Sequence, residues 1–404
     1  KKQFLEHGFI QLEEKEHWNL EEGKSYFVER NGSSMIAFHL PKKDFQGFHI
    51  VASHSDSPTY RIKEQPEMSV EKHYTKLNIE RYGGMIPETW FDRPLSVAGR
   101  IIIEENGQIK DQLVNVDRDL MIIPNLAIHM SRSSNESKQL NPQKDLLPLC
   151  GGNLTKDGFE EMIAKESGVE KEDILSYDLF LYNRMRGTTL GINEEFVAAP
   201  KLDDLECAYS SIEGMLNAKL SKDYVTVCAV FDNEEVGSGT KQGAGSTFFP
   251  EVLKRISYLC GKNEEEYYMA VADSFMLSAD NAHAVHPNYQ DKTDPTNRPY
   301  INEGIVLKYN ASQKYTTDAN SAALVKYLCK KEKIKCQVFF NRSDMLGGST
   351  LGNILTGQVS IKAADIGLPQ LSMHSTYETA GCKDLDDMIT LMGSFYELGK
   401  EVQI

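Results

Sequence analysis

The feature that most limits how this chain can fold is an apolar run that ends abruptly at two adjacent acids. Residues 224–231 are rich in apolar and β-branched side chains, which predicts a buried strand. Glu234 and Glu235 follow shortly after it, and then Gly237. In an open α/β sheet, residues just past a strand's carboxyl end line the active-site crevice. Neighbouring glutamates there repel each other, so a cation or a shared proton must stabilise them.

This stretch has two interpretations. In the first, one glutamate binds a metal cluster and the other acts as a general base. In the second, the two acids form a solvated turn on the surface. The stretch alone does not separate these interpretations, so the remaining chain has to decide between them.

The segments after residue 200 alternate between helix-like and strand-like patterns. Such alternation predicts an α/β fold with a mostly parallel sheet that is covered by helices. We expect helices at 205–216, 249–259, 320–331 and 384–401, and strands at 224–231, 267–273, 335–340 and 359–365. Near the N-terminus we expect a helix at 3–12 and a strand at 47–53 that ends at His54.

The pattern of apolar and polar residues changes between about residues 94 and 195. Strand-like segments such as 97–103 and 112–115 alternate there with polar turns, and no cluster of metal-binding side chains is evident. We therefore predict a catalytic domain formed by residues 1–93 plus 196–404. An inserted β-rich domain is expected at 94–195.

Composition excludes several functions. The formal net charge of −15 argues against a nucleic-acid partner. No apolar run approaches the roughly 18 residues that a membrane span needs. The seven cysteines lack CxxC spacing, which argues against a disulfide framework and a thiolate zinc site and favours a cytoplasmic location.

Histidines and carboxylates recur near the ends of the expected strands. His54 and Asp56 lie two residues apart in an extended segment, so their side chains point the same way and Asp56 can orient His54 as a metal ligand. The other candidates are Asp203, Glu235, Asp280 and His374, with Glu234 beside Glu235. Histidines plus carboxylates, without cysteine, suit a pair of zinc or similar divalent ions.

Each candidate also has a purely structural alternative. His54 and His374 could be hydrogen-bonded core histidines, and Asp203 could be a helix N-cap. The loop at 278–289 favours function, because it combines Asp280 with His283 and a second histidine directly after a strand. Other chemistries lack their signatures, since the chain has no HExxH, GxxxxGK[ST], GxGxxG or GxSxG motif.

Taken together, the motifs resemble those of the aspartyl aminopeptidase family, the M18 metallopeptidases. The resemblance extends in order over nearly the whole chain. Its motifs are HSDSP (54–58), YGG (82–84), WFDR (90–93), LAIH (126–129), NPQKDLLPL (141–149), LDDL (202–205), DNEEVGS (232–238), SADNAHAVHPNY (278–289), NRSDMLGGSTLG (341–352) and DIGLPQLSMHS (365–375).

This resemblance implies an aminopeptidase that removes N-terminal residues, Asp or Glu, from peptides. It implies two divalent ions per subunit, zinc with cobalt or manganese as alternatives. One ion would be bound by His54 and Asp280 and the other by Glu235 and His374, with Asp203 bridging both. Glu234 would be the general base, and Asp56 would polarise His54.

The resemblance also implies roles around the substrate. His283 and Lys308 match positions that line the substrate pocket, and Lys308 would pair with an acidic substrate side chain. His129 in the inserted domain matches a histidine that reaches the active site of a neighbouring subunit. The implied assembly is a tetrahedral homododecamer built from dimers, in which the inserted domain makes much of the contact.

The chain departs from the family's motifs at two positions, and three other functions compete with the one that the resemblance implies. Many members have Asn where Asp204 stands and Arg where Tyr377 stands, so the chain could prefer neutral residues such as leucine. Another two-metal class, such as M42 aminopeptidases or M20-type deacylases, would share HxD, EE and a late His but not HAVHPNY or LPQLSMHS. A non-catalytic self-assembling shell is the third rival, and the intact candidate site argues against it.

Overall fold

The structure is a computed structural model that describes residues 1–131, 139–153 and 157–402. The chain divides into two compact units. The first unit consists of Lys1–Asp56, Thr189–Met373 and Glu378–Ile404. The second consists of Ser57–Thr188 together with the short segment His374–Tyr377. The chain therefore leaves the first unit and returns to it more than once.

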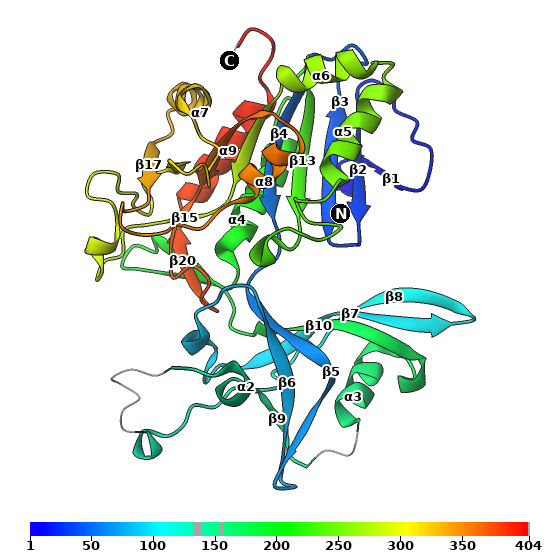
Figure 1. Ribbon diagram of the computed structural model, residues 1–404, viewed down its shortest axis with the longest axis vertical. Coiled ribbons are helices and arrows are strands. Elements are labelled where there is room, and N and C mark those ends of the chain that lie inside the picture. The colour runs from blue at the N-terminus through cyan, green and yellow to red at the C-terminus, as the bar shows by residue number, and fades with distance from the viewer. Residues whose placement is uncertain (132–138, 154–156, 403–404) are drawn as a thin grey trace. The chain divides into compact units, whose positions relative to one another are not determined.

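A nine-stranded sheet forms the centre of the first unit (Figure 1). Five of its eight neighbouring strand pairs are parallel and three are antiparallel. The four strands β13, β4, β14 and β18 form a continuous parallel block in the middle. In spatial order the strands are β1 (Ile10–Leu12), β2 (Lys24–Arg30), β3 (Ser34–Leu40), β13 (Val225–Phe231), β4 (Phe48–His54), β14 (Phe275–Ala279), β18 (Lys362–Gly367), β16 (Ile305–Tyr309) and β17 (Cys336–Phe340).

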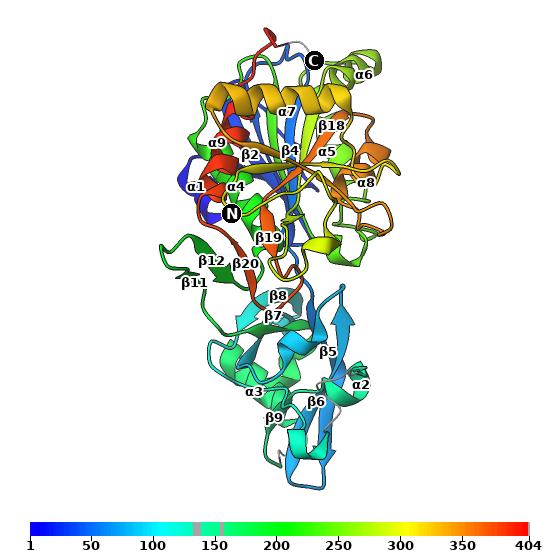
Figure 2. The ribbon, with the colours of Figure 1, turned by 90° about the vertical axis from the view of Figure 1, so that its left-hand side faces the viewer.

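Helices cover both faces of this sheet (Figures 1 and 2). One face packs against α5 (Phe248–Leu259), α6 (Glu264–Ala272) and α8 (Leu351–Gln358). The other packs against α1 (Lys2–Glu6), α4 (Leu202–Asn217), α7 (Ala319–Glu332) and α9 (Asp384–Tyr396). Because both faces are buried, the central strands read as nearly continuous apolar runs. All seven residues of β4 are buried.

A smaller sheet of five strands carries part of the loop after β14. Its spatial order is β11 (Thr188–Leu190), β12 (Phe196–Ala199), β20 (Glu378–Gly381), β19 (Pro369–Leu371) and β15 (Ala282–His283). The two residues of β15 pair in parallel with Pro369 and Gln370. This pairing fixes the chain that follows Asp280.

The second unit is built on a six-stranded sheet with its own hydrophobic core. Its spatial order is β8 (Gln108–Asn115), β7 (Leu95–Glu105), β10 (Ile174–Asn183), β5 (Thr59–Val70), β6 (Tyr74–Tyr82) and β9 (Leu149–Gly151). Two helices, α2 (Pro142–Asp145) and α3 (Gly158–Ser167), accompany it. The unit is strand-rich, as the sequence predicted for its second domain.

The second unit begins earlier than residue 94, the boundary expected from the sequence. The hairpin of β5 and β6 lies between Thr59 and Tyr82, and β5 pairs with β10 through Phe180 and Arg61. Residues 57–93 therefore belong with the second sheet and not with the first unit. Sequence patterns alone do not reveal which sheet a strand joins, so this boundary was not evident.

The α/β class is confirmed, but two predicted elements were wrong. The expected strand at 267–273 lies in α6, where the Asn263 side chain accepts from Glu266 N and the Glu266 side chain from Asn263 N. This capping box starts a helix, and the true strand β14 follows it. The expected helix at 3–12 ends at Glu6, since Gly8 takes a φ of +79° and β1 follows.

Candidate metal centre

Three neighbouring parallel strands end together at one edge of the large sheet. Phe231 at the end of β13 lies opposite His54 at the end of β4, and Ser278 of β14 lies opposite Ala52 of β4. The side chains that follow these strand ends therefore converge, as the sequence predicted. His54, the Glu234–Glu235 pair and Asp280 meet at this edge.

Asp203 reaches the same place from the start of α4. Lys201 has a left-handed backbone with φ +63°, and Asp203 and Asp204 keep non-helical backbone angles before the regular helix begins. Asp203 N donates to the Glu378 carboxylate at 3.0 Å. The irregular turn thus points the Asp203 carboxylate toward the strand ends, where it contacts His54.

Asp56 fixes the turn that carries both glutamates. Its two carboxylate oxygens accept hydrogen bonds from Glu234 N and Glu235 N, each at 3.1 Å. Asn233 with φ +63° and Gly237 with φ +91° bound this short turn. A carboxylate at the start of a helical turn satisfies backbone N–H groups that would otherwise lack partners.

Asp56 also orients His54. His54 Nδ1 lies 3.1 Å from the Asp56 carbonyl oxygen and 3.4 Å from its carboxylate. A proton on Nδ1 would donate to these oxygens, which leaves Nε2 directed at Asp203 Oδ1, 3.6 Å away, and at Glu234 Oε2, 4.0 Å away. Ligating histidines typically have this arrangement, because the second nitrogen fixes the tautomer.

The electrostatics of this edge are unfavourable for the protein alone. Burial raises the pKa of Glu234, with the charge of Asp280 adding to it. Burial likewise raises the pKa of Glu235, and Asp203 contributes. Burial lowers the pKa of His54, but hydrogen bonds to Asp203 and Asp56 outweigh it and raise that pKa well above the usual value. Buried acids of like charge call for a cation.

Within the first unit, two groups of side chains have the geometry to bind a metal ion. The ligand atoms of His54, Asp203 and Asp280 lie within 4.8 Å of one another, and so do those of His54, Glu234 and Glu235. His54, Asp203 and Asp280 are buried, and the two glutamates are half-buried. Imidazole nitrogen with carboxylate oxygen is a donor set that suits zinc, and oxygen-rich sets also accept manganese.

Asp204 does not bring an additional ligand into the cluster. It is fully buried, and its Oδ2 accepts a hydrogen bond from His54 N at 3.2 Å. Burial raises its pKa well above the usual value for aspartate. The neutral acid is therefore favoured at this position.

Lys308 lies beneath Asp280 and is only 2% exposed. Its Nζ donates to the carbonyl oxygens of Asp280 at 2.7 Å and Asn281 at 3.1 Å. The Asp280 carboxylate lies 3.7 Å from the same Nζ. The ammonium group thus supports the loop that carries Asp280, a contact that the sequence did not predict.

His283 lines a separate cavity of about 320 Å³ in the first unit. Phe339, Gln370, His286 and Arg342 also contribute to its wall. The ring centroids of His283 and Phe339 are 6.1 Å apart. Cationic and aromatic side chains therefore gather beside the loop that follows Asp280.

Three residues of interest belong to the second unit. His374 lies in the segment 374–377, where its carbonyl oxygen accepts from Ile86 N at 3.0 Å. Tyr377 donates its hydroxyl to the carbonyl oxygen of Arg186 at 2.7 Å. His129 is exposed within a short helical turn, Ile128–Met130. Their predicted roles at the active site stay predictions.

Sequence reasoning missed two residues that hold the cluster together. Asn281 is buried, and its Nδ2 donates to Leu202 O, Glu206 Oε2 and Gln370 Oε1. Glu378 in β20 accepts from Asp203 N. Asn281 could have been suspected because it adjoins Asp280, but Glu378 lies in an ordinary strand sequence and gave no signal.

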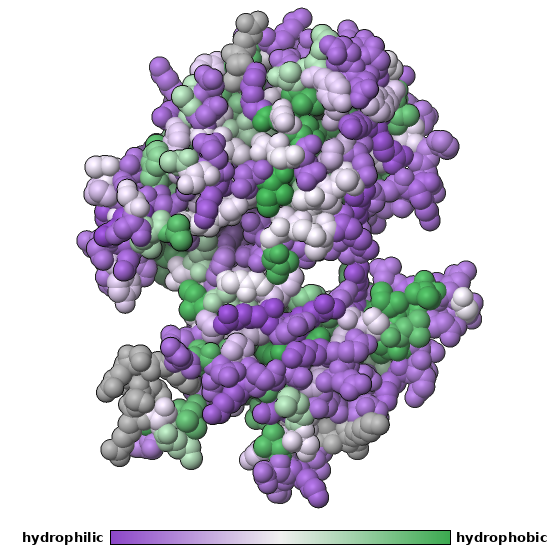
Figure 3. Space-filling view, viewed as in Figure 1, coloured by the Kyte–Doolittle hydropathy of each residue, from purple (hydrophilic) through white to green (hydrophobic). Residues whose placement is uncertain are grey.

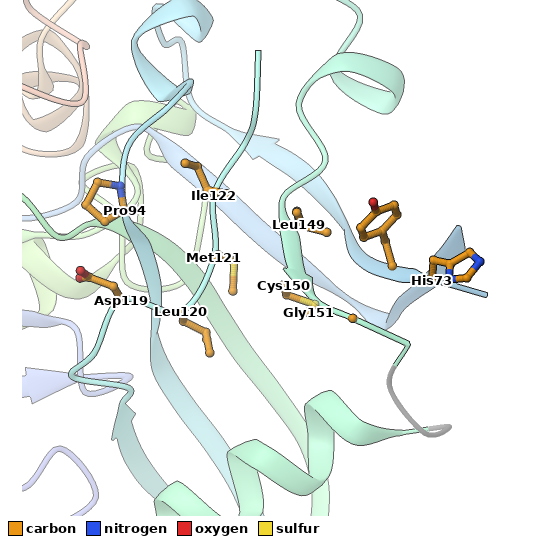
Figure 4. A pocket seen from close by; sticks show the side chains of 11 residues that line it. His73, Pro94, Asp119, Leu120, Met121, Ile122, Leu149, Cys150 and Gly151 are labelled. Carbon is orange, nitrogen blue, oxygen red and sulfur yellow. The ribbon is translucent and has the colours of Figure 1, made fainter. Parts of the chain in front are cut away.

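The second unit holds a larger cavity of about 590 Å³ (Figure 4). Its walls are mostly apolar and include Tyr74, Met121, Ile122, Leu149 and Cys150. His73 and Asp119 are the ionisable groups among its lining residues other than Tyr74 and Cys150. Among the residues that the structure describes, no group suited to metal binding includes a residue that lines this cavity.

Comparison with known proteins agrees with the geometry. The model of the family "Aminopeptidase I zinc metalloprotease (M18)" matches residues 1–396. A probable M18 family aminopeptidase 2 from Clostridium novyi is 46% identical, and the match covers 98% of this chain and 94% of that protein. The chain therefore belongs to the M18 family of zinc metalloproteases and is an aminopeptidase, a hydrolase.

Solved structures show the same fold. The structure of the Ape4 and Nbr1 complex matches with a TM-score of 0.94 and 37% identity, covering 98% of this chain and 81% of that one. The S. cerevisiae mApe1 dodecamer matches with a TM-score of 0.84 and 27% identity, and the match covers 98% of this chain and 91% of that one. In the described part of the chain, no helix combines the length and apolar character that crossing a membrane requires.

Proposed function

We propose that this aminopeptidase removes N-terminal residues from peptides with two divalent ions and with Glu234 as general base. The observation that supports this best is the convergence of His54, Asp203, Glu234, Glu235 and Asp280 at one sheet edge. Zinc is the proposed metal, with cobalt or manganese as alternatives. Such ions lower the pKa of water and polarise the scissile carbonyl when bound.

The proposed ligands divide between two ions. His54 and Asp280 would hold the first ion and Glu235 and His374 the second, with Asp203 shared. The mutual distances among His54, Asp203 and Asp280 support the first assignment. The assignment of His374 rests on the resemblance of the MHS motif to the family. Asp56 is proposed as the group that orients His54.

We propose that Glu234 moves protons during the reaction. Its raised pKa means that it takes up a proton readily, and its backbone is held by Asp56. We propose that its carboxylate accepts a proton from the attacking water and then passes it to the leaving amine. General-base catalysis of this kind contributes about 10²–10⁴-fold to the rate.

The proposed substrates are peptides with an N-terminal Asp or Glu, and neutral residues such as leucine are the alternative. Support comes from the cavity at His283, where Arg342 and Lys292 also lie. Lys308 is retained as a candidate partner of an acidic side chain. Its buried contacts with Asp280 favour a positioning role instead.

The proposed assembly is a tetrahedral homododecamer of dimers in the cytoplasm, without nucleic-acid or membrane partners. The dodecameric relative supports the assembly. So do exposed apolar residues of the second unit: Leu126, Ile128 and Met130 lie close in sequence to His129, which would reach a neighbouring subunit. Ile109 and Leu113 on β8 are also exposed, and Figure 3 shows a hydrophobic patch over the β7–β8 hairpin.

The decisive experiment is Glu234→Gln, with turnover and bound metal measured on the same preparations. We expect metal content near that of the wild type and a loss of about 10²–10⁴-fold in kcat on aspartyl, glutamyl and leucyl reporters. The matched control is Glu251→Gln. This variant removes a carboxylate on α5 that pairs with Arg30 at the end of β2. Turnover by Glu234→Gln at the wild-type rate would disprove the general-base role.

The wild-type protein tests the rest of the proposal. It should be stripped of metal and resupplied with zinc, cobalt or manganese before the same reporters are measured. Faster release from leucyl than from acidic reporters would keep the mechanism and overturn the acidic preference. No release with any metal would favour the non-catalytic shell.

A further inference from the structure

One buried amide in the wall of the His283 cavity has a donor without an acceptor. Gln370 in β19 is 1% exposed, and it lines the cavity of about 320 Å³ together with His283. Its Nε2 has no hydrogen-bond partner among the residues that the structure describes. Buried side-chain donors in folded proteins are nearly always paired, so an unpaired one needs an explanation.

Neighbouring contacts determine which end of this amide is unpaired. Asn281 Nδ2 donates to the carbonyl oxygen of Leu202 at 3.1 Å and to Gln370 Oε1 at 2.9 Å. Because a carbonyl oxygen can only accept, the Asn281 amide must present its nitrogen on this side. Gln370 must then present its oxygen to Asn281. The group left without a partner is therefore the donor Nε2 and not the acceptor Oε1.

Strand pairing places this amide between the metal centre and the cavity. Gln370 is the partner of His283 in the parallel pair of β19 and β15, so the two side chains lie on the same face of the small sheet. Asn281, which contacts Gln370, directly follows Asp280. The terminal torsion of a glutamine side chain varies broadly, so Nε2 can turn toward a molecule that enters the cavity.

The cationic side chains of this region are engaged or exposed. Arg342 lines the cavity, but it donates to both carboxylate oxygens of Asp344, at 2.7 and 2.9 Å. Lys308 donates to two backbone carbonyl oxygens of the loop after β14. Lys292 also lines the cavity and is exposed, so water screens its charge. The feature that most requires a matching group on a ligand is therefore the donor of Gln370.

We propose that Gln370 selects substrates by donating a hydrogen bond from Nε2 to a side-chain oxygen of the peptide's N-terminal residue. The substrates are then peptides that begin with Asp, Glu, Asn or Gln, because each of these side chains carries an oxygen acceptor. The inference rests on the proposed aminopeptidase function and extends its substrate class from acids to amides. A leucine side chain would leave the donor unpaired, and sites built to bond a polar group discriminate strongly against analogues that lack it.

The first test is Gln370→Glu, which keeps the oxygen that Asn281 contacts and replaces the donor by a second carboxylate oxygen. This carboxylate would repel an acidic substrate side chain, whereas an amide side chain can donate its own NH₂ group to it. Aspartyl, glutamyl, asparaginyl, glutaminyl and leucyl reporters should be compared at one metal concentration. We expect the ratio of kcat/KM on the glutaminyl reporter to that on the glutamyl reporter to rise about 10–100-fold.

The second test is Gln370→Met, which removes the donor without adding a charge. We expect kcat/KM on the four reporters with an oxygen in the side chain to fall about 10-fold or more relative to the leucyl reporter. The lost contact with Asn281 affects every reporter alike, so the ratios between reporters isolate the role of the donor. The control is Gln358→Glu at an exposed position at the end of α8, which should leave these ratios unchanged.

The outcomes separate this proposal from the function on which it rests. The proposal is overturned if the wild type prefers the leucyl reporter to the asparaginyl and glutaminyl reporters, or if both Gln370 variants keep the wild-type ratios. Failure of the aminopeptidase function would appear as no release of any reporter by the wild type with any metal.

If the wild type releases no reporter, isothermal titration calorimetry with L-glutamine and L-leucine decides. Glutamine binding that Gln370→Met weakens about 10-fold or more, relative to leucine binding, would support the role of the donor. Glutamine binding that the variant leaves unchanged, or no glutamine binding to the wild type, would overturn it.

Discussion

The two units hold their carboxylates in opposite ways. In the second unit, Asp178 accepts hydrogen bonds from Arg61 and Arg100 on the open face of the sheet, and its side chain is 36% exposed. In the first unit, Asp203 and Asp280 are buried beside two half-buried glutamates at one sheet edge. The first arrangement pairs each charge at the surface. The second crowds like charges where water cannot screen them.

This difference indicates which acids serve structure and which serve function. A fold does not need crowded buried acids, because burying charges costs more than it returns unless they are neutralised. Such a cluster is retained when a cation or a reaction uses it. Lys308 and His54 are the basic groups that contact the cluster among the described residues of the first unit.

The variant expected to lose the most activity, and so to test this difference between the two units most strongly, is a substitution of Asp56. Asp56→Asn replaces one of the two oxygens that accept from Glu234 N and Glu235 N by an amide that cannot accept. We expect kcat/KM to fall about 10–100-fold with acidic and leucyl reporters alike. Steady-state kinetics and bound metal should be measured together.

The control for Asp56 is Asp232→Asn in the same turn. Asp232 accepts from Asn233 N at 2.8 Å but not from the backbone of either glutamate. This variant should keep nearly full activity. Equal losses in both variants would mean that the turn tolerates no change, and the specific role of Asp56 would be lost.

Lys308 gives the next largest effect. Lys308→Met removes the buried ammonium from Asp280 while keeping a long apolar side chain. We expect a loss of about 3–5 kcal/mol in the free energy of unfolding without added metal, because a buried carboxylate loses its partner. Denaturant unfolding measures this loss. If activity falls only with acidic reporters and stability is kept, Lys308 binds the substrate carboxylate instead.

The sequence could predict the site residues that follow a local strand pattern, but not those that act through contacts between distant segments. His54, Glu234, Glu235 and Asp280 follow recognisable strands, and strand ends meet at one edge of a parallel sheet, so their convergence was predictable. Asn281 and Glu378 hold the cluster through contacts between distant segments. Such contacts leave no local pattern, so these two residues could not be found.

The fold shows the same limit. Periodicity located β13, α5, α7 and β17 to within a residue or two. It failed at Tyr267–Asp273, where an aromatic and apolar run resembles a strand although a capping box at Asn263 starts a helix. It also could not assign the β5–β6 hairpin to the second sheet, since pairing with β10 depends on residues more than a hundred positions away.

A moderate effect on the pH dependence of the unfolding free energy is expected at His49. This buried residue of the first unit is remote from the metal centre. Burial lowers the pKa of His49 to about 3, and its ring stacks on Tyr224 with centroids 4.0 Å apart. The folded pKa lies below the unfolded one. His49 therefore contributes stability above about pH 6.5, and this is lost as the pH falls toward about 3.

His49→Phe should remove this acid sensitivity while keeping an aromatic ring on Tyr224. Between pH 7 and pH 5 the wild type should lose about 2 kcal/mol more of its unfolding free energy than the variant does. Urea unfolding at both pH values measures the difference, with His17→Phe at an exposed histidine as the control. An identical pH dependence in wild type and His49→Phe would contradict the assignment.

The smallest effect should appear in the second unit, where the comparison predicts that the charges matter little. Asp178→Ala removes the partner of Arg61 and Arg100, whose side chains are 45% and 29% exposed. Exposed pairs of this kind contribute about 0.2–1 kcal/mol each, since water and salt screen them. We therefore expect a loss of less than about 2 kcal/mol in urea unfolding, a still smaller loss in high salt, and unchanged kcat. A larger loss that salt does not reduce would show that this pair behaves like a buried one, and exposure would then no longer distinguish structural from functional acids in this protein.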